Sequence, residues 1–153
     1  MKTAKWLLIC TLGMGAANAN TIFNNGDYDL GTQLASCAAY IQLNKELLPV
    51  NDQTLNVRKH LDGLVMGWRM AATTALLAEV ETKDIARVIT NSIMDSTATE
   101  VLARLDFISI KPKESAIQEF KSLILEIQTE WDDCLRFNDD VERLQKIARV
   151  HFM

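Results

Sequence analysis

Residues 117–134 read IQEFKSLILEIQTEWDDC and carry the most regular apolar stripe in the chain. The apolar residues recur at alternating steps of three and four, at Ile117, Phe120, Ile124, Ile127, Trp131 and Cys134. This spacing places the side chains on one face of an α-helix. Pro112 suits a position at or just before the first turn, where a backbone N–H has no helical partner to lose. The stretch therefore predicts a helix that buries this face and has a cysteine near its end.

A first helix is predicted well ahead of this stretch. Apolar residues recur at helical spacing from Leu30 to Leu48. Pro49 ends the helix, because proline disfavours helical geometry in the residue before it. The preceding segment from Thr21 to Gly31 is rich in Asn, Asp and Gly, which predicts a loosely held arm.

Two helices are predicted between the first helix and Pro112. One is capped by Asn51 or Asp52 and continues to about Glu79. The next is capped by Thr82, with Asp84 in its first turn, where the helix dipole favours an acid. Its expected inward face consists of Ile85, Val88, Ile89, Ser92, Ile93, Val101, Leu102 and Leu105.

Three segments leave the helix boundaries open. The polar residues from Asp95 to Glu100 are expected to break or kink the third helix. The alternating residues from Phe107 to Lys111 are compatible with an extended segment, although one such segment cannot form a sheet. Asn138 and Asp139 either interrupt the last stripe or begin a fifth helix.

The composition agrees with a helical fold. The chain has 153 residues, of which 48% are apolar and 24% charged, a normal composition for one globular domain. Two prolines and six glycines are too few for a turn-rich β architecture. We therefore predict an all-α, single-domain bundle of four to five helices.

The first 19 residues have the pattern of a secretory signal peptide. Lys2 and Lys5 precede an apolar run from Trp6 to Ala17, and Ala17-Asn18-Ala19 is a small-x-small cleavage site. The apolar run is too short to span a membrane, which requires about 20 residues. The sequence thus predicts export to the periplasm or beyond, with residues 20–153 as the mature helical domain.

Cleavage would leave Cys37 and Cys134 as the remaining cysteines, because Cys10 lies in the signal peptide. An even cysteine count in an exported chain predicts a disulfide, and here only one pairing exists. Each cysteine lies in an apolar helical stripe, so both are expected to point inward. The bond would pin the first helix to the fourth.

A line of small residues runs along the second helix at four-residue steps: Gly63, Gly67, Ala71 and Ala75. Small side chains at this spacing let another helix approach closely. In a bilayer they would suggest a dimerisation face. Arg69 lies in the centre of this run and is costly in a membrane, so we expect a buried helix and no membrane insertion after signal cleavage.

The sequence contains no recognisable catalytic or cofactor motif. It has no HExxH, GxSxG, glycine-rich phosphate loop or EF-hand pattern. Its two histidines, His60 and His151, have no other metal ligands at suitable spacing. The formal charge of −4, which becomes −6 without Lys2 and Lys5, disfavours nucleic-acid binding. We therefore expect no enzyme activity, no cofactor, no metal and no nucleic-acid partner.

Acidic residues are concentrated around Cys134. A negative surface of this kind attracts a cationic partner, and it also keeps an exported protein soluble. Its candidate contact residues are Glu126, Glu130, Asp133, Asp139 and Asp140.

Two segments of the chain show a family resemblance. Residues 34–40, LASCAAY, resemble the first-helix cysteine segment of periplasmic immunity proteins that neutralise type VI secretion amidase effectors. Residues 133–137, DCLRF, followed by Val141 and Leu144, are similar to the C-terminal cysteine segment of that family. The resemblance implies an inhibitor that binds a toxin by surface contact, with a homodimer as one possible assembly. It assigns no individual binding residue.

The sequence leaves three functions open. The first is an exported protein-binding module that acts as an immunity or inhibitor protein. The second is a small envelope stress, chaperone-like or assembly protein, which would expose an apolar patch for its clients. The third is a carrier with a ligand cavity between its helices, which methionines and Trp68 would line.

Overall fold

The structure, a computed structural model, describes residues 27–152. The predicted signal peptide lies outside the described residues. The elements in chain order are α1 (Asp27–Leu47), α2 (Leu55–Leu76), α3 (Lys83–Ser109), α4 (Lys113–Cys134), a 3₁₀ turn η1 (Leu135–Phe137) and α5 (Asn138–Phe152). The predicted all-α bundle is confirmed for this part of the chain, and the fifth helix is present.

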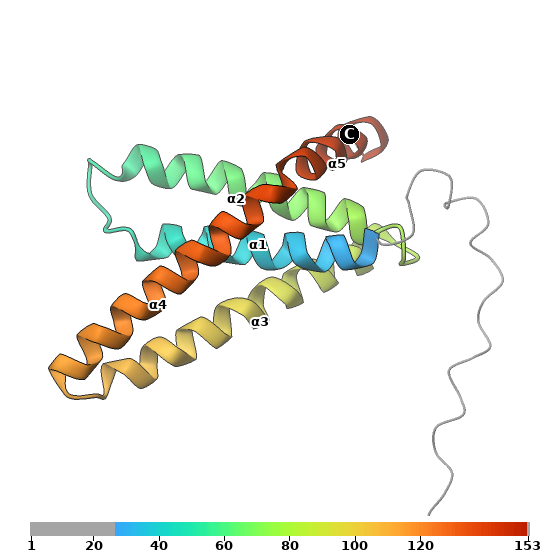
Figure 1. Cartoon of the computed structure of the whole chain (residues 1–153). Coiled ribbons are helices and arrows are strands. Elements are labelled where there is room, and N and C mark those ends of the chain that lie inside the picture. Colours follow the sequence, from blue (N-terminus) through green and yellow to red (C-terminus); the bar gives the residue numbers. More distant parts are fainter. Residues whose placement is uncertain (1–26, 153) are drawn as a thin grey trace, which may run out of the picture.

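The helices pack as two hairpins and a short terminal helix (Figure 1). α1 and α2 lie side by side and share the most extensive contact in the fold. α3 packs along α1, and α4 crosses α1 diagonally. The α1–α2 and α3–α4 connections lie toward the same side of the molecule but are splayed apart. α5 packs against α2.

The main core lies between α1 and α2 and is completed by the C-terminal part of the chain. Trp68 of α2 meets Trp131 of α4 edge to face, with ring centroids 5.7 Å apart. The disulfide between Cys37 and Cys134 is present in this core, with Cα atoms 5.8 Å apart. The fully or nearly fully buried members include Leu34, Ala38, Ile41, Ala71, Ala72, Ala75, Val141 and Leu144.

A second, smaller core joins the C-terminal half of α1 to the α3–α4 hairpin. It consists of Leu43, Val101, Ile108, Leu123 and Ile127. Val101 and Ile108 are seven residues apart and therefore lie on one face of α3, two turns from each other. This core holds the hairpin against α1.

The predicted inward face of α3 is wrong at several positions. Ile85, Val88 and Leu102 are exposed, whereas Ala86 and Thr90 are fully buried. The buried threonine is tolerated because its hydroxyl donates to the carbonyl of Ala86 at 2.9 Å. The small side chains allow α3 to pack closely here, which a search for large apolar residues does not detect.

The expected interruptions of α3 are also absent, since the helix is continuous from Lys83 to Ser109. The polar residues 95–100 mostly face solvent, and the hydroxyl of Thr97 donates to the carbonyl of Ile93 at 3.0 Å. In residues 107–111, for which the sequence left an extended conformation open, Ile108 packs into the second core while Phe107 and Ile110 are exposed. Tertiary packing thus determines that this segment is helical, because the segment is too short for its hydrophobic period to distinguish a helix from a strand.

Helix ends are partly as predicted. The Thr82 hydroxyl caps α3 by accepting from the backbone N–H of Ile85 at 3.2 Å, and Pro112 precedes α4. α2 begins later than expected, because Asn51 forms a turn in which its side chain accepts from the backbone N–H of Thr54. The prediction of a loosely held arm from Thr21 to Gly31 is wrong for its last five residues, because residues 27–31 begin α1.

The apolar stripe of α4 is buried only in its C-terminal half. Ile127 and Cys134 are buried, whereas Ile117 and Phe120 are 45% and 42% exposed. The N-terminal half of α4, which contains these two exposed residues, lies in the α3–α4 hairpin, and the end of this hairpin is splayed apart from the α1–α2 connection (Figure 1). No helix within residues 27–152 has both the length and the apolar character needed to cross a membrane.

We predict that loss of the disulfide strongly destabilises the fold. The Cys37→Ser variant should lose on the order of 2–5 kcal/mol, because the bond joins residues 97 positions apart and restricts the unfolded chain. Thermal melting of the oxidised protein with and without reductant measures the effect. Equal melting temperatures would contradict a stabilising bond, and Ser36→Ala serves as a neighbouring control.

Alanine substitutions at two glycines should change the stability of the fold in opposite directions. A Cβ at Gly31 would lie 2.7 Å from Cγ of Leu76 and 3.1 Å from its backbone nitrogen, whereas a Cβ at Gly63 would meet nothing within 4 Å. Gly31→Ala should therefore destabilise by about 1–3 kcal/mol through overpacking. Gly63→Ala should stabilise by up to about 1 kcal/mol through helix propensity. The midpoints of urea unfolding measure both changes in stability. If both substitutions shift the midpoint in the same direction, this packing would be contradicted.

Candidate protein-binding groove

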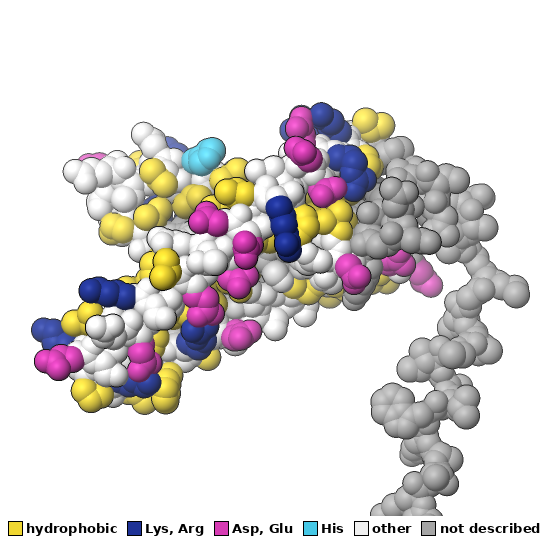
Figure 2. All heavy atoms as spheres, in the orientation of Figure 1, with side chains coloured by type: hydrophobic (Ala, Val, Ile, Leu, Met, Phe, Trp, Pro, Cys, Tyr) yellow, Lys and Arg dark blue, Asp and Glu magenta, His cyan; other side chains and the backbone are white. Residues whose placement is uncertain are grey.

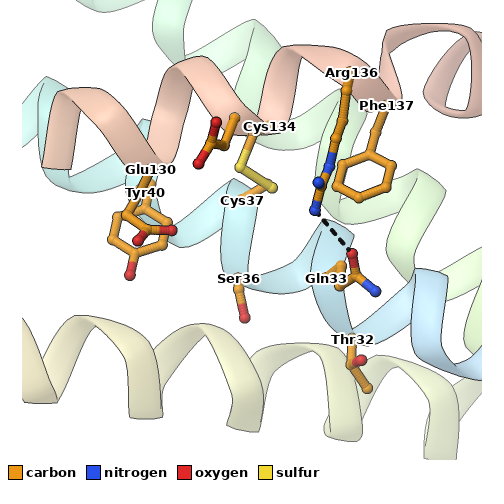
Figure 3. Close-up of a pocket in the computed structure, with 10 residues that line it drawn as sticks. Thr32, Gln33, Ser36, Cys37, Tyr40, Glu130, Cys134, Arg136 and Phe137 are labelled. Carbon is orange, nitrogen blue, oxygen red and sulfur yellow. Dashed lines mark hydrogen bonds between the residues drawn. A yellow bond between two sulfur atoms is a disulfide. The ribbon is translucent and has the colours of Figure 1, made fainter. Parts of the chain in front are cut away.

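A groove of about 240 Å³ lies beside the disulfide, between α1 and the C-terminal end of α4. Figure 3 shows Glu130 and Tyr40 at one end, Arg136 and Phe137 at the other, and the disulfide between them. We call this the α1–α4 groove. It is lined by Thr32, Gln33, Ser36, Cys37, Tyr40, Glu130, Asp133, Cys134, Arg136 and Phe137.

The α1 wall is a line of hydroxyl groups. Thr32, Ser36 and Tyr40 recur every four residues and therefore share one face of the helix. All three point from α1 toward α3 (Figure 3). The wall thus offers hydrogen-bond donors and acceptors without formal charge.

Tyr40 marks the most acidic part of the groove. Burial raises the pKa of its phenol first of all, and the negative charges of Glu130, Glu100 and Glu126 raise it further. Arg104 acts in the opposite direction. The hydroxyl group is therefore held in its neutral form in a negative electrostatic environment.

The α4 wall carries the carboxylates. Glu126, Glu130 and Asp133 are separated by four and three residues and lie on one face of α4, and acidic side chains gather along this helix in Figure 2. Glu126 accepts two hydrogen bonds from Arg104 of α3, at 2.5 and 2.7 Å, and this pairing lowers the pKa of its carboxyl group. Within the described residues, neither Glu130 nor Asp133 forms an ion pair.

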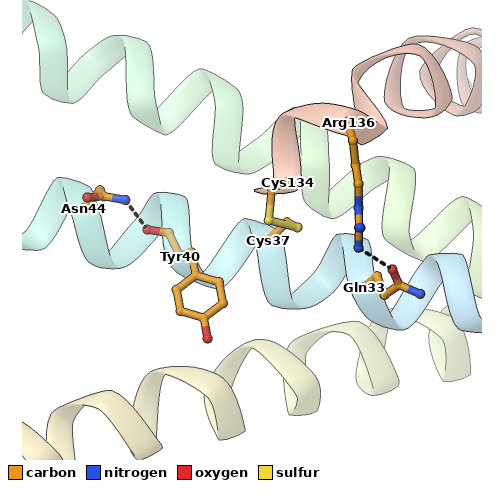
Figure 4. The surroundings of a disulfide bond; sticks show 6 residues. All are labelled: Gln33, Cys37, Tyr40, Asn44, Cys134 and Arg136. Atoms are coloured by element: carbon orange, nitrogen blue, oxygen red, sulfur yellow. Dashed lines mark hydrogen bonds between the residues drawn. A yellow bond between two sulfur atoms is a disulfide. The ribbon is translucent and has the colours of Figure 1, made fainter. Parts of the chain in front are cut away.

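The disulfide fixes the two walls relative to each other. Both cysteines line the groove, and their side chains are 4% and 5% exposed. Figure 4 shows that the bond joins the middle of α1 to the last turn of α4. The spacing of the hydroxyl and carboxylate walls is therefore set by a covalent link.

Arg136 provides a positive charge at the opposite end. Its guanidinium lies over the Phe137 ring, 4.6 Å from the centroid, and donates a long hydrogen bond of 3.5 Å to Oε1 of Gln33. No carboxylate of the described residues lies within ion-pair distance of it. Most of its five N–H donors are thus available to a ligand.

The predicted acidic residues lie on two different helices. Glu126, Glu130 and Asp133 lie along α4, but Asp139 and Asp140 lie in the first turn of α5 and do not line the groove. The turn η1 separates the two groups, and Asp140 is 3.5 Å from Arg143. Of the predicted acidic residues, Glu130 and Asp133 are thus the ones that line the groove.

Sequence reasoning missed most of the non-acidic lining. The four-residue spacing of Thr32, Ser36 and Tyr40 beside Cys37 was visible in the sequence and is the signal that could have identified the α1 wall. Arg104 and Arg136 could not be placed, because their roles depend on contacts between elements distant in sequence. No group of three or more His, Cys, Asp or Glu residues between positions 27 and 152 is arranged to hold a metal ion.

An exposed apolar surface lies at the tip of the α3–α4 hairpin. The exposed large apolar residues near the α3–α4 connection are Phe107, Ile110, Ile117 and Phe120, with Phe107 58% and Ile110 78% exposed. Lysines lie around it, and Nζ of Lys111 is 4.4 Å from the centroid of the Phe107 ring. We call this the apolar tip; Figure 2 shows apolar, basic and acidic side chains intermixed at this end of the molecule.

Comparisons of the chain with protein-family models, with curated proteins and with solved structures find no match. The functional assignment therefore depends on the geometry of the groove and of the apolar tip.

The negative environment of Tyr40 predicts a pKa response. Glu130→Gln should lower the pKa of the Tyr40 phenol, because one of the charges that disfavour its ionisation is removed. Absorbance titration in a background lacking Tyr28, the other tyrosine, measures the change. Glu114→Gln on the same helix but outside the groove should leave the pKa unchanged. An equal shift in both variants would contradict a local effect.

Proposed function

We propose that this protein is an exported, non-enzymatic helical module that binds another protein through the α1–α4 groove. The observation that carries the proposal is the groove itself, in which two carboxylates that have no ion-pair partner among residues 27–152 lie beside the disulfide together with a line of hydroxyl groups. Such a surface attracts a cationic segment of a partner and disfavours anionic partners.

The rigidity of the groove supports binding by surface contact. Its walls belong to two helices linked covalently and packed on the main core, so little side-chain or backbone order must be gained on binding. Glu130 and Asp133 are exposed, and a cation placed between them would gain two charge-assisted hydrogen bonds. Tyr40 and Ser36 can donate or accept further bonds.

The finer proposal is that the bound partner is a secreted effector and that binding neutralises it. The similarity of residues 34–40 and 133–137 to segments of periplasmic immunity proteins supports this role, and both segments contribute to the groove. Co-expression with candidate hydrolase toxins tests it, because an inhibitor should protect the cells from its own effector. Lack of protection would restrict the proposal to protein binding.

The apolar tip supports a second candidate function. A chaperone-like envelope protein needs an exposed apolar surface, and Phe107, Ile110, Ile117 and Phe120 provide one. The groove would then have no direct role in binding. The two functions therefore predict contact at different ends of the α4 helix.

Site-specific photo-crosslinking in host cells distinguishes them. A photo-reactive residue at Ser36 in the full chain should give a discrete adduct, whereas one at the exposed Lys59 of α2 should not. Glu130→Lys together with Asp133→Lys should abolish the Ser36 adduct, because the introduced charges repel a cationic segment.

The remaining outcomes decide between the candidates. Heterogeneous adducts at Ile110 with none at Ser36 would support the client-binding function and contradict the groove. A Ser36 adduct that survives charge reversal would contradict a cationic partner segment. The absence of adducts at both positions would contradict both functions.

A further inference from the structure

We infer that the α1–α4 groove recognises a bipolar segment, in which Glu130 and Asp133 hold a cationic side chain and Arg136 holds a carboxylate. The inference rests on the proposed function and adds a required negative charge in the partner. The observation that carries it is the opposite sign of charge at the two ends of one groove (Figure 3).

The position of Arg136 is fixed by its neighbours. It lies two residues after Cys134, in the turn η1, so the disulfide holds its backbone close to α1. Stacking on Phe137 and the bond to Gln33 orient the guanidinium toward the groove. An oriented guanidinium loses less side-chain entropy when it binds a carboxylate, and its planar fork allows two parallel hydrogen bonds.

Other arginines show what distinguishes this one. Arg104 is satisfied by two hydrogen bonds to Glu126, and Arg58 donates to the carbonyl oxygens of Lys45 and Leu48. Among the described residues, Arg136 has only the long bond to Gln33 and the aromatic contact. It therefore combines a preferred orientation with unused donors beside an acidic wall.

The spacing suits an extended peptide. Glu130 and Arg136 are separated by about 9–10 Å along the helix and turn axis, from the rise per residue of each. Residues two or three positions apart in an extended chain are about 7–10 Å apart. A lysine and a glutamate two positions apart, with their own side-chain length, can therefore reach both ends.

Three capped peptides of five residues test the inference. All have glycine at positions one, three and five and lysine at position two; position four is glutamate, glutamine or lysine. Capping removes the terminal charges, so only the side chains differ. Binding to the oxidised full-length mature chain is measured at low ionic strength by amide chemical-shift titration.

We expect the lysine–glutamate peptide to bind about two- to five-fold more tightly than the lysine–glutamine peptide, as for an exposed ion pair. Arg136→Gln should abolish this preference, Arg136→Lys should retain part of it, and Arg69→Gln on α2 should leave it unchanged. Glu130→Gln with Asp133→Asn should weaken every peptide. Circular dichroism confirms that each variant is folded.

The contradicting results separate the two proposals. Equal binding of the glutamate and glutamine peptides, tighter binding of the dilysine peptide, or an unchanged preference in Arg136→Gln would overturn the bipolar inference and leave intact the proposal that the groove binds a cationic segment. Binding of none of the peptides would contradict the proposed groove function and the inference together.

Discussion

The disulfide between Cys37 and Cys134 joins α1 and α4 at the end of α4, and this point determines how the rest of α4 can lie. On the C-terminal side, η1 and α5 turn back so that Val141 and Leu144 complete the main core. On the N-terminal side, α4 crosses α1 and follows the hairpin with α3 away from α2 (Figure 1). The molecule is therefore dense around the crosslink and more open at the hairpin tip, where Ile117 and Phe120 remain half exposed.

The same constraint produces the groove. The disulfide holds α4 at its last residue, Cys134, and the chain continues from there as the 3₁₀ turn η1. Side chains before Cys134 therefore lie on one side of the disulfide, and side chains after it lie on the other. In this chain the preceding residues are Glu130 and Asp133, and the following residue is Arg136. The charge separation along the groove thus arises from sequence order around Cys134, and α1 supplies the opposing wall of hydroxyl groups.

The helical class, the disulfide pairing and most helix positions followed from the sequence because they depend on local periodicity and on cysteine arithmetic. The buried face of α3 did not follow from the sequence. Ala86 and Thr90 are small residues, and their burial depends on how closely α1 and α2 approach α3. The acidic residues of the groove were identified by their density, but the division of Asp139 and Asp140 from Glu130 and Asp133 depends on the direction change at η1. Arg104 and Arg136 depend on contacts between distant elements, which a single sequence does not specify.

The crosslink also explains how the fold tolerates a charged groove. Glu126, Glu130 and Asp133 share one helix face and repel one another. Of these three, only Glu126 has an ion-pair partner in the described part of the chain, Arg104. Exposed charges interact weakly across water, so this repulsion is a modest cost. A covalent bond that restricts the unfolded chain adds stability that does not depend on how the surface is charged. The protein can therefore retain Glu130 and Asp133 without an ion-pair partner among residues 27–152, because its stability does not rely on pairing them internally.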